Sequence, residues 1–244
     1  MILIVGSSND DILYFESILK NKKEVNVLNQ FTAYSGEIFN QKVMLLKDMY
    51  SSYLSAAVIS HVIEKFMVIL VIYVGEVQSF TDTLSVGDIC ICRQTVIADV
   101  NVSDVTNVAK GQIPGFQQSF LANAEITEAI NRSLENRTSV PHRLVTYIST
   151  NYHPEDKEKM DAVSKNDMIF GIAGEVVLSS EIGGIAMASK LHDVPYAAVA
   201  VVGRKIGFKS GIQEYLNVLE QYTNIGKAVI SLIGDIGRTD VVKQ

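Results

Sequence analysis

The stretch that decides the fold of this chain lies between residues 83 and 115. It opens with Thr83-Leu84-Ser85-Val86-Gly87-Asp88-Ile89, runs on through Ile89-Cys90-Ile91-Cys92, passes Asp104-Val105-Thr106 and closes with Gly111-Gln112-Ile113-Pro114-Gly115. The apolar residues at its centre predict a buried strand over residues 88–92. The Pro-Gly pair at its end predicts a turn, because proline presets φ and glycine accepts the positive φ that many turns need.

The N-terminal residues predict a strand, a turn and a helix. Residues 2–5 form an apolar strand that ends at Gly6. The polar turn Ser7-Ser8-Asn9-Asp10-Asp11 consists of residue types that favour helix N-termini. Residues 11–20 then have helical spacing, with apolar residues recurring on one face. A strand–turn–helix opening suits an α/β fold, in which ligands bind beyond the carboxyl ends of strands.

The rest of the pattern alternates strands with helices. Residues 31–37 and 42–46 predict a hairpin, and the apolar run 68–74, bounded by Gly75, is typical of a central strand covered on both faces. We therefore expect an α/β fold, a single domain over residues 1–244 with a mixed twisted β-sheet sandwiched by helices. The other expected strands are residues 144–149, 176–178 and 196–202, and the expected helices are residues 53–66, 121–134, 156–165, 179–191 and 212–232.

Composition narrows the class of partner. The chain has 244 residues, 48% of them hydrophobic, and a formal net charge of −6. That charge disfavours nucleic acid or an anionic membrane, because either would attract a basic face. The longest apolar run, residues 66–74, is far shorter than the ~20 residues that span a bilayer as a helix. The N-terminus lacks the basic region and cleavage site of a signal peptide, so we expect a cytoplasmic protein.

The two cysteines do not predict a disulfide or a metal site. Cys90 and Cys92 are two residues apart in an expected strand, where a disulfide would be strained. Two thiols without nearby histidine or further cysteine do not make a zinc site, so we expect free, buried side chains in a reducing compartment. No P-loop, Gly-x-Gly-x-x-Gly, His-Glu-x-x-His or Gly-x-Ser-x-Gly motif occurs, and we expect neither metal nor cofactor.

The order and spacing of the motifs in residues 83–115 and 179–202 resemble those of bacterial 5′-methylthioadenosine/S-adenosylhomocysteine nucleosidases, a family of the nucleoside phosphorylase superfamily. The resemblance extends from the N-terminus to about residue 232 and implies a homodimeric N-ribosyl hydrolase of purine nucleosides. Residues 111–115 are similar to the family's loop that reaches the neighbouring subunit, so Pro114 would contact the partner's ligand. The alternative is a Pro-Gly turn with a structural role only.

Hydrolysis of a nucleoside needs a proton donor for the leaving purine, a carboxylate for the water and an acceptor for the ribose hydroxyls. By the resemblance, Asp11 stands where a glutamate handles the water, and Glu181, in Leu178-Ser179-Ser180-Glu181, stands where a glutamate binds the ribose. Tyr152 could stack on the purine. Both carboxylates also have a structural explanation, because acidic residues favour helix N-termini. The other expected substrate contacts are Ser7, Gly75 and Ser180.

The same resemblance shows where this chain departs from the family. Aligning Val194-Pro195-Tyr196 on the family's Val-Pro-Phe brings Arg204 onto the aspartate that donates the proton. An arginine stays charged at any working pH and cannot donate it. Two glycine-rich turns become Met49-Tyr50-Ser51 and Gly75-Glu76-Val77-Gln78-Ser79, so we expect Tyr50, Val77 and Gln78 to crowd or reshape the pocket.

Two functions fit this pattern. The first is an N-ribosyl hydrolase that acts on a methylthioadenosine-like nucleoside, with Asp11 at the water, Glu181 at the ribose and Arg204 at the position of the acid. The second is a catalytically inactive homologue that binds a nucleoside or has a structural or partner-binding role. Release of free adenine from methylthioadenosine distinguishes the two.

Overall fold

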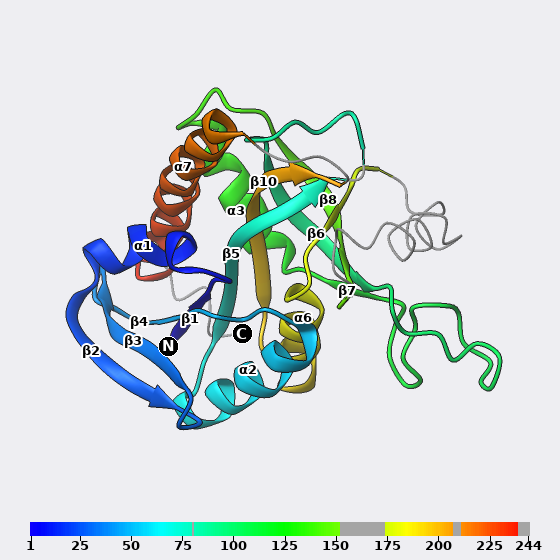
Figure 1. Cartoon of the computed structure of the whole chain (residues 1–244). Helices are drawn as coiled ribbons and strands as arrows, with labels where there is room; N and C mark the ends of the chain where they lie inside the picture. The colour runs from blue at the N-terminus through cyan, green and yellow to red at the C-terminus, as the bar shows by residue number, and fades with distance from the viewer. Residues whose placement is uncertain (80, 152–173, 207–210, 239–244) are drawn as a thin grey trace.

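The computed structural model describes residues 1–79, 81–151, 174–206 and 211–238 (Figure 1). Tyr152 and the helix predicted over residues 156–165 lie outside the described residues. The strands are β1 (Ile2–Val5), β2 (Lys20–Val27), β3 (Phe31–Ile38), β4 (Gln41–Leu46), β5 (Leu70–Ser79), β6 (Ile89–Ile97), β7 (Ser119–Leu121), β8 (His142–Ser149), β9 (Val176–Leu178) and β10 (Tyr196–Lys205). The helices are α1 (Asn9–Ile18), α2 (Ser52–Phe66), α3 (Ala124–Glu135), α6 (Ile182–Leu191) and α7 (Ile212–Ile236).

The strands form one mixed sheet in the order β10-β6-β8-β9-β5-β1-β4-β3-β2, with β7 paired to β6. β1 lies parallel to β4 and β5, and β5 lies parallel to β10. Because β10 also pairs with β6, the strands β5, β9, β8, β6 and β10 close into a ring, from which β1, β4, β3 and β2 extend. The α/β class and the mixed sheet expected from the sequence are confirmed.

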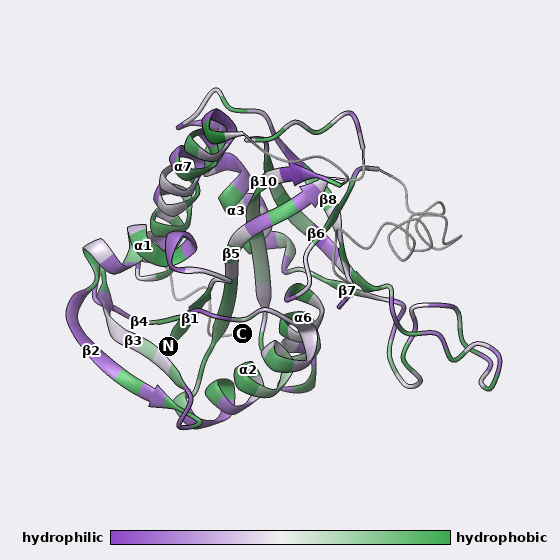
Figure 2. Cartoon of the chain, in the orientation of Figure 1, coloured by the Kyte–Doolittle hydropathy of each residue, from purple (hydrophilic) through white to green (hydrophobic). Residues whose placement is uncertain are grey.

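Helices cover both faces of this sheet. α2 and α6 pack on one face, where Ile59 and Ile185 join the apolar side chains of the strands. α1, α3 and α7 cover the other face, where Phe15 and Ile225 do the same. Hydrophobic residues are accordingly concentrated in β1 and in the lower parts of β5 and β10, between the two helix layers (Figure 2).

Most expected elements are present with shifted ends. α1 begins at Asn9 rather than at residue 11. α6 begins at Ile182 rather than at residue 179, which leaves Glu181 at the helix N-cap. β2 was not predicted, because its exposed residues Lys20-Asn21-Lys22-Lys23-Glu24 lack an apolar pattern. It pairs only with β3 at the edge of the sheet, where lysines discourage pairing with another chain.

Both cysteines are free and buried, as expected. Burial raises the pKa of Cys92 to about 12, so its thiol stays protonated and packs as a small apolar group. Across the part of the chain that the structure describes, no cluster of histidine, cysteine and acidic residues could hold a metal ion. No described helix is both long and apolar enough to cross a bilayer.

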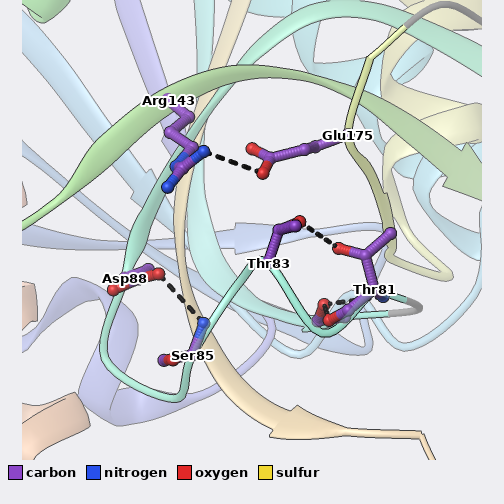
Figure 3. A network of polar contacts seen from close by, with 7 residues as sticks. Thr81, Thr83, Ser85, Asp88, Arg143 and Glu175 are labelled. Carbon is purple, nitrogen blue, oxygen red and sulfur yellow. Dashed lines mark hydrogen bonds and ion pairs between the residues drawn. The ribbon is translucent and has the colours of Figure 1, made fainter.

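Residues 81–88, which precede β6, form a turn with hydrogen bonds of its own (Figure 3) and contact β10. The Ser85 N–H donates to Asp88 Oδ2 at 2.9 Å and closes the turn. The Gly87 N–H donates to the Val202 carbonyl at 2.8 Å, and the Val202 N–H donates to the Asp88 carbonyl at 2.9 Å. Gly87 has φ +96°, which favours glycine. The backbone of β10 is thereby fixed immediately before Gly203.

Residues 98–118, between β6 and β7, project from the body of the molecule (Figure 1). Val105 on this segment is 81% exposed, and Pro114 is exposed as well. Ile113 and Phe116 are partly buried against the core, so the segment is anchored where it returns to the sheet. This is the connection that carries the Gly-Gln-Ile-Pro-Gly motif.

Candidate active site

The turns after β1 and β9 converge on the second half of β5. β1 ends with Val5 opposite Tyr73, so β5 continues beyond β1 and borders the turn of residues 6–11. β9 runs antiparallel to this part of β5 and leads directly to Glu181. The turn of residues 6–11 and the residues after β9 therefore lie at the same part of β5.

Asp11 lies in the first turn of α1 and is only 2% exposed. Its Oδ2 accepts hydrogen bonds from the backbone N–H groups of Ser7 at 2.7 Å and Ser8 at 2.8 Å. A Cβ on Gly6 would lie 2.8 Å from Asp11 Cβ, so the turn needs glycine there. The carboxylate thus caps α1, as its structural explanation predicts. Burial nevertheless raises the pKa of Asp11, although hydrogen bonds from Tyr222 and the turn oppose the shift.

Glu181 stands at the N-cap of α6, yet its side chain does not cap the helix. Its Oε2 accepts a hydrogen bond from Ser179 Oγ at 2.8 Å, and the side chain is buried. Burial raises the pKa of Glu181, and the negative charge of Asp11 contributes in the same direction. Capping therefore does not explain Glu181, whose carboxylate contacts Ser179 and Tyr73.

Tyr73 lies between these two carboxylates and was not singled out from the sequence. Its ring is fully buried, and its hydroxyl lies 3.2 Å from Ser7 Oγ and 3.5 Å from Glu181 Oε2. A Cβ on Gly75 would lie 2.4 Å from that hydroxyl, so the ring folds back over the glycine. The sequence did contain one indication of this role. Tyr73 interrupts an aliphatic run two residues before Gly75, and residues two apart in a strand lie on the same face.

The three residues that were expected to crowd or reshape the pocket differ in position. The charges of Asp11 and Glu181 contribute to a raised pKa of Tyr50, which places Tyr50 near both carboxylates. Val77 is buried in the core beneath α2 and α6. Tyr50 is 62% exposed and donates a hydrogen bond to Asp48 at 3.1 Å. Gln78 faces Arg204. Tyr73 is the residue that contacts both Ser7 and Glu181.

Arg204 pairs with Gln78 across the ladder of β5 and β10. With the Gln78 amide turned so that its oxygen faces Arg204, the guanidinium Nε and Nη2 both donate to that oxygen at 3.0 Å. The permanent cation expected at this position is therefore present. The Nε and Nη2 donors of Arg204 point from β10 to Gln78 on β5.

The structure brings four of the expected site residues together: Ser7, Asp11, Gly75 and Glu181. Ser180 lies beside them, but its described contact is structural, since its carbonyl accepts a hydrogen bond from Ser149 Oγ at 3.1 Å. Pro114 lies on the projecting segment.

This fold, with carboxylates gathered where strands end, is that of a phosphorylase-type α/β protein. The model of the Phosphorylase superfamily matches residues 1–231, and the chain belongs to that family.

Among relatives, the chain is similar to 5′-methylthioadenosine/S-adenosylhomocysteine nucleosidases. It is 20% identical to that of Oceanobacillus iheyensis over 96% of this chain and 98% of the relative. It is 30% identical to that of Anoxybacillus flavithermus over 54% of this chain, and this match spans 56% of the relative's length.

Solved structures show the same fold. The nucleosidase of Neisseria meningitidis, in complex with methylthio-immucillin-A, superimposes with a TM-score of 0.83 at 20% identity, over 96% of this chain and 98% of that one. That of Colwellia psychrerythraea, in complex with adenine, gives a TM-score of 0.82 at 18% identity, over 96% and 94%.

Proposed function

We propose that this protein hydrolyses the N-ribosidic bond of a purine nucleoside of the 5′-methylthioadenosine class. The observation that carries the proposal is the meeting of two buried carboxylates, Asp11 and Glu181, at the second half of β5. Burying two acidic groups next to each other costs free energy, and such an arrangement is typical of a site with a chemical task. The names of the relatives support the choice of substrate.

Each carboxylate has a distinct part in the proposed reaction. Glu181 accepts hydrogen bonds from the ribose hydroxyls, for which a carboxylate has enough lone pairs. Asp11 accepts the proton of the attacking water, and its raised pKa makes it a better base than an exposed aspartate. Ser7 lies between them and contacts the sugar. Tyr152 stacks on the purine, and neither a metal nor a cofactor takes part.

The test is direct. The pure protein is incubated with methylthioadenosine and with adenosylhomocysteine, and free adenine is measured. We expect adenine release that falls by about 10²-fold or more in Glu181→Gln and stays unchanged in Glu24→Gln, an exposed glutamate of β2. Release at background level from high concentrations of the wild type would refute the proposal.

One observation favours a second function. The Tyr73 hydroxyl lies within hydrogen-bond distance of Glu181, where a ribose hydroxyl would have to bind. The protein would then be a catalytically inactive homologue that binds a nucleoside or has a structural or partner-binding role. Calorimetry with adenine and methylthioadenosine separates these cases, since binding without turnover indicates a ligand-binding protein and no binding indicates a structural one.

The remaining expectations belong to the same proposal. We propose a cytoplasmic homodimer, built from one domain over residues 1–244, in which the segment carrying Pro114 helps to close the partner's site. The support is the exposure of Pro114 on a segment that leaves the body of the molecule.

A further inference from the structure

The proposed reaction still needs a proton for the leaving purine. In that reaction Asp11 takes the proton of the water and Glu181 binds the ribose, so neither supplies this proton. Arg204 cannot release a proton at any working pH. Glu76 carries a further carboxyl group within this part of β5.

Glu76 points to the α7 side of the sheet. Side chains alternate along a strand, and Val74, two residues earlier, packs in the core beneath α1 and α7. The charge of Glu76 contributes to the raised pKa of two tyrosines of α7, Tyr215 and Tyr222. The carboxylate therefore lies near both. It is also close enough to Asp11 for the charge of Asp11 to raise the pKa of Glu76.

A glycine in β10 makes room for this carboxyl group. The pairing of β10 with β5 is irregular between Val202 and Arg204, and Gly203 lies in this bulge. A Cβ on Gly203 would lie 1.9 Å from Glu76 Cδ and 2.2 Å from its Oε1. The carboxyl group of Glu76 therefore rests on the Gly203 backbone, in the space that a side chain at position 203 would fill and beside Arg204.

The surroundings of this group favour its protonated form. Burial of the carboxyl group is the largest influence and raises the pKa of Glu76, and Arg204 opposes it. The Glu76 side chain is exposed, so a ligand bound at this end of β5 can reach it. A carboxyl group with a raised pKa that a ligand can reach is suited to general acid catalysis.

We propose that Glu76 is the general acid of the nucleosidase reaction, so that the proton comes from β5 and not from position 204. This inference rests on the proposed function. As the C1′–N bond breaks, its electron pair goes to the purine, and the Glu76 carboxyl proton passes to a purine ring nitrogen. Water adds to C1′ and gives its proton to Asp11. Base and free sugar leave, and solvent carries the proton from Asp11 back to Glu76.

The experiment compares two leaving groups in wild type, Glu76→Gln and the control Glu24→Gln. Methylthioadenosine releases a base that must be protonated, whereas 4-nitrophenyl 5-methylthio-β-ribofuranoside releases a phenolate that needs no proton. We expect Glu76→Gln to lower adenine release by about 10²–10⁴-fold and nitrophenolate release by at most about threefold. Glu24→Gln should match the wild type on both substrates.

Each other outcome overturns the inference in a recognisable way. Equal losses on both substrates would make Glu76 a positioning or structural residue. Unchanged adenine release would exclude it as the acid. A wild type that cleaves the nitrophenyl riboside but not methylthioadenosine would leave the roles of Asp11 and Glu181 intact and remove that of Glu76. A wild type that cleaves neither substrate would refute the proposed function itself.

Discussion

At the scale of the residue, Arg204 opposes the effect of burial on the pKa of Glu76. The groups that face Glu76 are Arg204 from β10, Asp11 from α1, and Tyr215 and Tyr222 from α7. Of these, Arg204 lowers the pKa of Glu76. A general acid works only while protonated, so the rate falls as the pH rises through its pKa. We expect Arg204→Gln to raise that pKa and to move the descending limb of the pH profile of kcat/KM for adenine release to higher pH.

The matched control for this prediction is Arg132→Gln, which removes an exposed arginine of α3 that pairs only loosely with Glu128. Its pH profile should coincide with that of the wild type. A descending limb that stays in place in Arg204→Gln, or moves to lower pH, would show that Glu76 is not the group that titrates.

If Glu181 binds the ribose as proposed, the Tyr73 hydroxyl competes with the substrate for it. In Tyr73→Phe the ring keeps its packing, but the hydroxyl that lies 3.5 Å from the carboxylate is lost. We expect the KM for methylthioadenosine to fall, because the carboxylate then has no phenol to displace. The free energy of unfolding should fall by about 1 kcal/mol through the lost hydrogen bonds. Steady-state kinetics and urea denaturation measure the two effects.

Tyr147→Phe is the control, since Tyr147 is equally buried and donates its hydroxyl to the Cys90 carbonyl at 2.8 Å, away from the site. It should lose similar stability with no change in KM. If KM responds equally in both variants, or in neither, Tyr73 does not compete with the ribose.

At the scale of the element, α2 and α6 pack closely through one glycine. A Cβ on Gly184 would lie 2.0 Å from the Ser52 carbonyl oxygen and 2.6 Å from the Ala56 nitrogen, and backbone atoms cannot swing aside. We expect Gly184→Ala to destabilise the protein by about 1–3 kcal/mol through overpacking. Urea denaturation measures this change.

Gly234→Ala in α7 provides the comparison, because its Cβ would meet only the ring edge of Phe39 at 3.2 Å. The Phe39 side chain is 61% exposed and can shift. Since alanine also favours a helix more than glycine does, this variant should be neutral or slightly more stable. A Gly184→Ala protein as stable as Gly234→Ala would mean that the two helices separate at little cost.

Elements whose burial is local could be predicted from the sequence, and those that depend on distant partners could not. β1 and the first half of β5 are continuous apolar runs, and β3 and β4 are joined by a turn, so their signals are contained in a few residues. β2 exists because β3 offers it a partner, not because its charged residues favour a strand. The closure of the β5–β10 ring is likewise a property of the assembled sheet.

The same division holds in the site. The two carboxylates Asp11 and Glu181 follow strands, and their positions could be predicted from the order of elements and the resemblance. Tyr73 and Glu76 lie inside a strand, where a residue normally packs in a core. Tyr73 contacts Ser7, and Glu76 contacts Gly203. Both partners come from other parts of the chain, so the sequence of β5 alone does not predict these contacts.

At the scale of the whole molecule, the structure of a single chain does not explain why residues 98–118 project from the body. Long connections without a strand or helix are uncommon in compact domains and usually have a function. Val105 on it is 81% exposed. An apolar side chain on a projecting segment gains burial only from another molecule, and a second copy of this chain meets that need if the segment closes the partner's site.

We therefore expect sedimentation velocity to give twice the mass of the chain, and Val105→Asp to weaken the dimer by about tenfold or more, because a charge is costly to bury at an interface. Met67→Asp is the matched control, since Met67 is 79% exposed at the end of α2, away from this segment, and aspartate tolerates its positive φ of 51°. If the segment completes the partner's site, adenine release per chain should also fall in Val105→Asp on dilution and recover at high concentration. A Val105→Asp protein that sediments and reacts like Met67→Asp at every concentration would leave the segment, and the motif that carries Pro114, with a structural role only.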